Sequence, residues 1–228
     1  MTDDPHPPRG WEVTWERGSA GDFHARPVPS EPVRSAQVLE VDRPALVLGS
    51  TQPEVDADRP ALLARGIELV RRRSGGGAVL LEQGASLWVD VVVPRTDPVW
   101  SDDVGVAFHW LGGAWADALG ELGVVADVHR GPLLTTRWSR LVCFAGLGPG
   151  EVTVGGAKAV GIAQRRTREG ARFQCAVLHR WDAEAMVSLL ALGPADREVA
   201  TAELAAVAIG IDSPTATVVD ALLRHLPR

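Results

Sequence analysis

Residues 71–79 read Arg-Arg-Arg-Ser-Gly-Gly-Gly-Ala-Val, and this glycine turn decides how the middle of the chain folds. Segments 67–72 and 78–82 predict a strand on each side of it. Three consecutive glycines lose extra conformational entropy on folding, so they are expected where the backbone must approach a ligand. Successive N–H groups in such a turn can bind an anion, and Arg72 is placed to add a bidentate contact to a phosphate or carboxylate. A glycine-rich hairpin without a ligand is the alternative interpretation.

Several common site signatures are absent. No Gly-Lys-Ser/Thr follows the glycine turn, so it is not a Walker A loop, and no strand–GxGxxG–helix order predicts a dinucleotide site. The six histidines show no H-x-x-x-H or H-E-x-x-H spacing, so no metal site is expected. The nucleophile elbow of many hydrolases, G-x-S-x-G, is also missing.

A second informative stretch, residues 151–164, reads Glu-Val-Thr-Val-Gly-Gly-Ala-Lys-Ala-Val-Gly-Ile-Ala-Gln. It predicts a hairpin in which Val152 and Val154 face Lys158 and Val160 across a Gly-Gly turn. Lys158 is the single lysine beside 22 arginines, and the chain has no tyrosine or asparagine. Those absences indicate a GC-rich genome, under which a lysine without a specific role is readily replaced by arginine. An ammonium here could neutralise a phosphate as a point charge, whereas an exposed strand lysine is the plainer interpretation.

The composition bounds the class of protein. A chain of 228 residues with 46% hydrophobic and 23% charged residues is ordinary globular composition, enough for one sizeable domain. The net charge of −6 argues against a nucleic-acid partner. No apolar run reaches the roughly 18 residues that a membrane span needs, and no signal-peptide pattern is present. We therefore expect a cytoplasmic protein with no nucleic-acid or membrane partner, and with Cys143 and Cys175 as buried, inert thiols inside strands.

The remaining pattern predicts an α+β fold with a mixed, largely antiparallel sheet and flanking helices. Residues 1–10 are expected to be a disordered tail and residues 18–32 a loop. Strands are expected at 11–16, 37–41, 45–49, 67–72, 78–82, 86–93, 124–129, 140–144, 151–154, 158–164 and 171–178. Helices are expected at 54–65 (with a late start at Pro60), from 102 or 103 to 122, and at 183–192, 196–209 and 214–226. Ser213 is the expected N-cap of the last helix, with Pro214 as its first residue.

Three motifs in a fixed order carry a family resemblance. They are Pro-Ala-Leu-Val-Leu-Gly-Ser-Thr-Gln-Pro at 44–53, Arg-Arg-x-Ser-Gly-Gly-Gly-Ala-Val ending at Val79, and Lys158-x-x-Gly161-x-Ala163-Gln. Across roughly residues 33–182 the chain resembles the lipoate–protein ligase A family. The resemblance implies a fold like that of biotin protein ligases and class II aminoacyl-tRNA synthetases. It also implies a tail and lead-in at 1–32 and a catalytic domain at 33–228, without the C-terminal accessory domain of many ligases.

The resemblance implies an ATP-dependent ligase as well. Such an enzyme activates lipoate or octanoate as an acyl-adenylate with Mg²⁺, and passes the acyl group to a lysine of a lipoyl domain. That domain belongs to a 2-oxoacid dehydrogenase complex or is the glycine cleavage H protein. Lys158 would be the catalytic residue, contacting the acyl carbonyl and the α-phosphate, where a cation stabilises developing charge. The implied binding residues are Arg72, Ser74, Gly75, Gly76, Gly77, Ala78, Val79, Leu80, Gly161 and Ala163.

The chain departs from the family at two motifs. Leu81-Glu82 stands where the family often has His-Asp, and Cys175-Ala176 where it often has His-Gly. Related octanoyltransferases lack the accessory domain and use a cysteine nucleophile, in some of them in a Cys-Phe pair that Cys143-Phe144 matches. The first alternative is therefore octanoyl transfer from acyl carrier protein through Cys143. The second is a relative that binds an acyl group or nucleotide without catalysis.

Overall fold

The structure, a computed structural model, describes residues 10–228, which form two β-sheets with helices around them. The order of the seven-stranded sheet is β1 (Glu12–Gly18), β2 (Ser35–Val41), β6 (Ser86–Pro94), β10 (Gly170–Leu178), β9 (Ala157–Arg166), β8 (Val152–Val154) and β7 (Asp127–Val128). Within it only the β1–β2 pair is parallel. The order of the three-stranded sheet is β4 (Glu68–Arg71), β3 (Ala45–Leu48) and β5 (Val79–Leu81). The predicted α+β class with a mixed, largely antiparallel sheet is confirmed.

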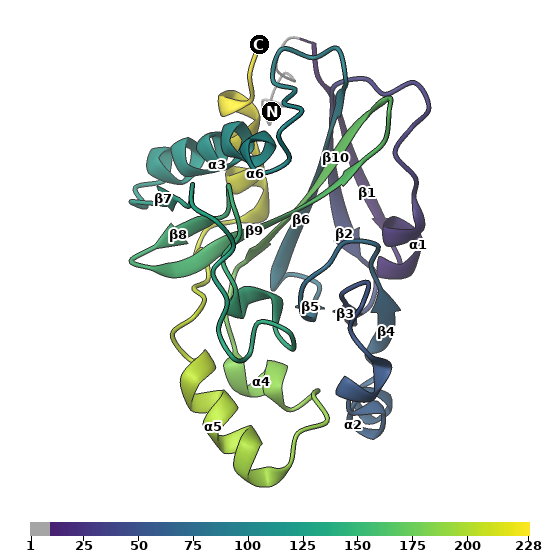
Figure 1. Cartoon of the computed structure of the whole chain (residues 1–228), viewed down its shortest axis with the longest axis vertical. Helices are drawn as coiled ribbons and strands as arrows, with labels where there is room; N and C mark the ends of the chain where they lie inside the picture. The colour runs from purple at the N-terminus through teal and green to yellow at the C-terminus, as the bar shows by residue number, and fades with distance from the viewer. Residues whose placement is uncertain (1–9) are drawn as a thin grey trace, which may run out of the picture.

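The helices cover the sheets from different sides (Figure 1). The α-helices are α1 (Ala20–Ala25), α2 (Arg59–Arg65), α3 (His109–Glu121), α4 (Ala183–Val187), α5 (Pro194–Leu204) and α6 (Thr215–His225). Short 3-10 helices are η1 (Glu54–Asp56), η2 (Val106–Phe108) and η3 (Cys143–Ala145). The main hydrophobic core joins α3 and α6 to one face of the large sheet. None of the described helices is long and apolar enough to cross a membrane.

Side-chain alternation separates the two faces of β10. Phe173, Cys175 and Val177 are buried in the core under α3 and α6. Because alternate residues of a strand point to opposite sides, Arg172, Gln174 and Ala176 lie on the other face. That second face is left for α1, the small sheet and the space between them.

The segment before the large sheet is more ordered than expected. The strand predicted at 11–16 is confirmed as β1, but the loop predicted at 18–32 is wrong, because Ala20–Ala25 form α1. The Ser19 hydroxyl caps this helix by accepting a hydrogen bond from the Asp22 N–H at 3.0 Å. Phe23 is 2% exposed and packs edge-on against Trp88. The burial of Phe23 stabilises a helix in a segment whose glycines and prolines had predicted a loop. The predicted tail at 1–10 lies outside the described residues except for Gly10.

Tertiary contacts shorten the helices relative to the prediction. Helix α4 ends at Val187 because the following residues bond to the η1 region, as in the Asp58 N–H to Leu189 carbonyl bond of 2.8 Å. Helix α5 ends at Leu204, and Val207 and Ile209 in the segment after it form backbone hydrogen bonds with Lys158. Helix α6 begins at Thr215 with Pro214 in the N-cap place, so the predicted Ser213 cap is wrong. The helix predicted at 54–65 divides into η1 and α2, and Pro60 lies in the first turn of α2.

The glycine turn is not a hairpin. Strands β4 and β5 pair with opposite edges of β3, and residues 72–78 therefore cross over the end of β3. Gly76 has φ +96°, a conformation that residues with a Cβ rarely adopt. A Cβ on Gly77 would lie 2.4 Å from the Val142 nitrogen. The glycines are required by this crossover and by its close approach to residues 141–142.

Candidate functional site

A cleft of about 730 Å³ lies between the glycine turn and the face of the large sheet that α3 and α6 leave uncovered. Its walls come from α1, the segment 51–56 after β3, the glycine turn with β5, Phe108, residues 133–151, and strands β9 and β10. The lining includes His24, Gln52, Asp56, Arg72, Arg73, Ser74, Gly75, Gly76, Val79, Arg140, Cys143, Glu151, Lys158, Gly161, Ala163 and Gln174. Residues more than 100 apart in the chain thus meet around one space.

Arg72 holds the glycine turn in shape from within. Its side chain is buried, and its Nη2 donates to the carbonyls of Gly75 and Gly77, each at 2.8 Å, while Nη1 donates to Val47 at 3.3 Å. The Gly75 and Gly77 carbonyls are turned toward Arg72, whereas the N–H groups of residues 74–77 donate no hydrogen bond to any group of residues 10–228. The turn therefore offers free N–H donors, as expected for an anion site. The ligand contact expected of Arg72 itself stays a prediction.

The Gly-x-x-Gln pattern at the end of β3 ties the small sheet to the segment before Cys143. The Gln52 side chain is buried; its amide donates to the Leu141 carbonyl at 3.2 Å, and its oxygen accepts from the Gly49 N–H at 3.4 Å. Arg71 adds a 2.6 Å bond to the Gln52 carbonyl. Gln52 itself lines the cleft, and these bonds fix the wall that the segment after β3 forms.

Cys143 differs from the buried strand thiol that the sequence predicted. The expected strand at 140–144 is wrong, because only Val142 forms a bridge, with Ala78, and Cys143 begins η3. The Cys143 N–H donates to the Ala78 carbonyl at 2.8 Å, which fixes this residue against the glycine turn. Its half-exposed sulfur lines the cleft, 3.6 Å from Arg72 Nη2 and 3.8 Å from the place of a Cβ on Gly76. A polar, reachable thiol is thus presented to the cleft.

Cys175 is confirmed as an inert core thiol. It is 1% exposed, and burial raises its pKa to about 12. The two cysteines therefore differ in chemistry although both were expected to be buried. Cys143 is exposed to the cleft because it begins a 3-10 helix, whereas Cys175 lies in a strand. The apolar residues around Cys143 are typical of a strand, so the sequence did not predict this 3-10 helix.

Lys158 is buried and fully engaged, so its interpretation as an exposed strand lysine is wrong. Its ammonium lies 2.7 Å from Glu151 Oε1 and donates to the carbonyls of Cys143 at 3.1 Å and Gly146 at 3.0 Å. Three acceptors match the three protons of an ammonium. Across the hairpin Val152 faces Val160 as predicted, but a bulge places Thr153 opposite Lys158. The expected contact of Lys158 with an acyl carbonyl and a phosphate stays a prediction.

Glu151 is a site residue that the sequence did not single out. Its carboxylate accepts from Lys158 and the Ile162 N–H through Oε1, and from the Gly148 N–H at 2.6 Å through Oε2. A Cβ on Gly161 would lie 3.2 Å from Lys158 Cε, so this glycine leaves the room that the ion pair occupies. One signal for Glu151 is present in the sequence. This residue begins the first strand of the predicted hairpin whose second strand holds the single lysine.

His24 is the second residue that sequence reasoning missed. It is 8% exposed, its ring stacks on Trp88 with centroids 4.3 Å apart, and its Nδ1 lies 3.4 Å from the Gln174 amide. Burial, with the nearby charges of Arg72 and Arg172, lowers the pKa of His24 to about 3. The imidazole is therefore neutral at physiological pH. No spacing in the sequence connects α1 with the glycine turn, so only the fold reveals it.

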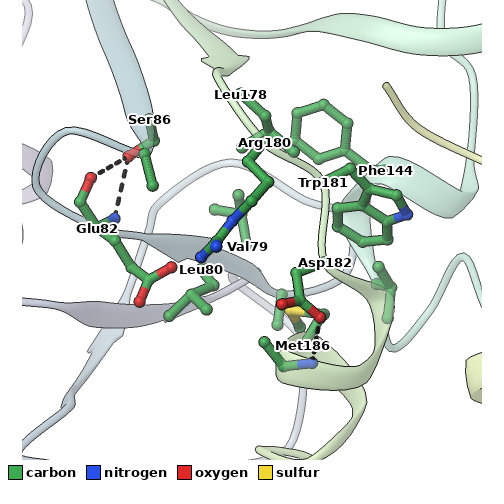
Figure 2. A pocket seen from close by; sticks show the side chains of 14 residues that line it. Val79, Leu80, Glu82, Ser86, Phe144, Leu178, Arg180, Trp181, Asp182 and Met186 are labelled. Carbon is green, nitrogen blue, oxygen red and sulfur yellow. Dashed lines mark hydrogen bonds between the residues drawn. The ribbon is translucent and has the colours of Figure 1, made fainter. Parts of the chain in front are cut away.

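Three of the predicted binding residues lie outside the main cleft. Gly77 packs against Val142, and the side chains of Ala78 and Leu80 line a second, smaller hollow of about 30 Å³. Figure 2 shows this hollow, with the Arg180 side chain extending across it and Phe144 beside Trp181. The Phe144 and Trp181 rings stack with centroids 6.1 Å apart, which anchors η3 immediately after Cys143. The hollow is large enough for about one water molecule and no larger ligand.

Comparisons with known proteins point to one family. The model of the lipoyl protein ligase A/B catalytic domain matches residues 28–225. Two curated relatives are octanoyltransferases named LipM. The protein from Moorella thermoacetica is 33% identical over 54% of this chain and 45% of its own length, and that from Kyrpidia tusciae is 33% identical over 68% and 58%. The chain thus spans about half the length of these relatives.

A solved structure supports the fold independently. A bipartite lipoate protein ligase from Thermoplasma acidophilum, described with its E2 lipoyl domain, aligns with a TM-score of 0.72 at 18% identity. The alignment covers 93% of this chain and 80% of that one. At this identity the likeness concerns the fold alone. The match to the family model covers most of the chain, which therefore belongs to the lipoyl protein ligase A/B catalytic domain family.

Proposed function

We propose that this chain transfers an octanoyl group from a carrier thioester to a lysine of a lipoyl domain, with Cys143 as the nucleophile. The observation that carries the proposal is the thiol of Cys143, which lines the cleft and is fixed against the glycine turn. The names of the two curated relatives support the same choice of reaction. Acyl carrier protein is the proposed donor, and the acceptor is a lipoyl domain of a 2-oxoacid dehydrogenase complex or the glycine cleavage H protein.

The reaction would proceed in two transfers. In the first, the Cys143 sulfur attacks the thioester carbonyl, the bond to the donor sulfur breaks, and the donor leaves as a thiol carrying the cysteine proton. In the second, the ε-amine of the acceptor lysine attacks octanoyl-Cys143, an amide forms, and a proton from the amine returns to sulfur. Each transfer places negative charge on the carbonyl oxygen. The free N–H groups of residues 74–77 are the donors available to stabilise it.

Lys158 and Glu151 would act by positioning the nucleophile. The ammonium of Lys158 binds the carbonyl of Cys143, the first residue of η3, and that of Gly146, the residue that follows η3. Glu151 in turn fixes Lys158 through the 2.7 Å ion pair. All three hydrogen-bond donors of this ammonium are therefore engaged, which suits Lys158 to holding η3 in place.

The ATP-dependent ligase remains the second candidate, and the same free N–H groups support it because they could bind the α-phosphate of an acyl-adenylate. Mg²⁺ would then neutralise the leaving pyrophosphate. The described residues do not fit a protein-bound Mg²⁺, because they contain no group of three acidic, histidine or cysteine side chains, and Glu151 is occupied by Lys158.

Two assays distinguish these candidates. Incubation with an octanoyl thioester should yield a protein whose mass increases by one octanoyl group located on Cys143, and a lipoyl domain should then remove it. Cys143→Ser should abolish the transfer, whereas the core variant Cys175→Ala should retain it. Lipoate- or octanoate-dependent exchange of pyrophosphate into ATP that survives Cys143→Ser and vanishes in Lys158→Ala would instead establish the ligase. Tight acyl binding with neither activity would establish a non-catalytic binder and refute both enzymes.

A further inference from the structure

Two arginines without a counter-ion lie at the cleft, one in its lining and one on a strand that forms one of its walls. Arg73 is exposed and lines the cleft, and Arg165 lies half-buried on β9. Among residues 10–228, neither has a carboxylate within ion-pair distance; the neighbouring Arg172, opposite Arg165 in register, is paired with Asp90. Arg165 shares its sheet face with Gly161 and Ala163, since alternate strand residues point to the same side. Burial lowers the pKa of Arg165, and the positive charges of Arg73 and Arg172 lower it further.

Two buried polar atoms on these segments are left without partners. Arg165 Nη1 and the hydroxyl of Ser74, the residue after Arg73, are both shielded from solvent and have no hydrogen-bond partner among the described residues. The N–H groups of residues 74–77 are also free. A buried donor without a partner destabilises a fold. Several donors left free beside two unpaired cations are what an anion site presents before its ligand binds.

The other charged groups of the cleft do not neutralise this site. Glu151 is paired with Lys158, and His24 is neutral because burial lowers its pKa to about 3. Asp56 is the remaining acidic residue of the lining, against the cations of Arg72, Arg73 and Arg140. The cleft is therefore cationic in a chain whose net charge is −6. That contrast favours an anionic ligand over a neutral one.

We propose that Arg73, Ser74 and Arg165 bind the phosphate group of the acyl donor, on the arm that presents the thioester to Cys143. Tetrahedral phosphate oxygens accept from guanidinium, hydroxyl and N–H donors together, which is the set assembled here. An octanoyl thioester carries no charge of its own, so the anion must belong to the carrier arm. This assignment of the arm rests on the proposed transferase function. A nucleotide offers the same phosphate chemistry, and the experiment below separates the two sources.

Two donors that differ only in phosphate provide the test: octanoyl-pantetheine and octanoyl-4′-phosphopantetheine. For each, KM and kcat are measured with a lipoyl domain as acceptor, for the wild type, Arg73→Gln and Arg165→Gln. We expect each variant to raise KM for the phosphorylated donor roughly 10-fold, as loss of a charged hydrogen bond would. The kinetic constants for octanoyl-pantetheine should not change. Arg43→Gln, which removes an exposed arginine paired with Asp42, is the matched control and should affect neither donor.

Direct binding keeps the site testable if no transfer occurs. Calorimetry with 4′-phosphopantetheine, pantetheine and ATP is performed on the same variants. Weaker binding of 4′-phosphopantetheine alone supports the carrier arm, even where a missing acyl-enzyme defeats the proposed transferase. Equal effects on phosphorylated and unphosphorylated ligands, or no effect of either substitution, would overturn the site. Weaker binding of ATP alone would overturn the carrier arm and assign the arginines to a nucleotide.

Discussion

The ion pair of Lys158 and Glu151 gives the sharpest quantitative prediction. Its side chains are 4% and 8% exposed, and its atoms lie 2.7 Å apart. At an effective dielectric constant of about 20 this distance corresponds to roughly 6 kcal/mol of attraction, most of it offset by desolvation of the two charges. Glu151→Gln leaves the ammonium buried without a counter-charge, and loss of one partner from a buried pair costs about 3–5 kcal/mol of unfolding free energy. With a urea m-value of about 2–3 kcal/mol/M, the unfolding midpoint should fall by roughly 1–2 M.

A double-mutant cycle measures the pair itself. Glu151→Gln, Lys158→Met and the double variant are unfolded in urea at neutral pH and followed by tryptophan fluorescence. Because the double variant removes both charges, it should be less destabilised than the sum of the single variants, by about 2 kcal/mol or more. The reasoning is wrong if the single-variant losses add to within about 0.5 kcal/mol. It is also wrong if Glu151→Gln costs less than about 1 kcal/mol, since the ammonium would then have found another partner or water.

Three further predictions follow from individual residues. In Gly161→Ala the new Cβ would lie 3.2 Å from Lys158 Cε and crowd the ion pair, so this variant should lower transfer activity and destabilise the fold by about 1–3 kcal/mol. Gly113→Ala on α3 is the control, because the space around its Cβ is open, and it should change neither property. Burial and the charges of Arg72 and Arg172 lower the pKa of His24 from 6.5 to about 3. Between pH 6.5 and about pH 3, His24 therefore binds a proton in the unfolded chain and none in the folded chain. The free energy of unfolding should therefore fall as pH decreases through this window, by up to about 1.4 kcal/mol per pH unit, and His24→Phe should remove that part of the slope in urea titrations. Iodoacetamide at pH 8 should modify Cys143 and spare Cys175, whose pKa burial raises to about 12; mass spectrometry showing label on Cys175 in the folded protein would contradict the assigned core position.

Local patterns predicted most strands and the class of fold, but not the ends of the helices. Alternation and apolar runs are properties of a few neighbouring residues, so β1, β6 and β10 were visible from the sequence. The helix predicted at 183–192 ends at Val187 because Leu189 bonds to the distant Asp58. Such a bond depends on residues about 130 positions apart, and no local pattern contains it.

The sequence by itself determined the family and the α+β class, and it singled out the glycine turn and Lys158, because these depend on ordered motifs and on which residue types are present. The tertiary structure decided the surroundings of those residues. It buried Lys158 against Glu151, placed the Cys143 thiol at the cleft while enclosing that of Cys175, and left Arg73 in the cleft lining without a carboxylate partner. Burial and charge proximity set the chemistry of a side chain, and both arise only when strands distant in the chain are brought together.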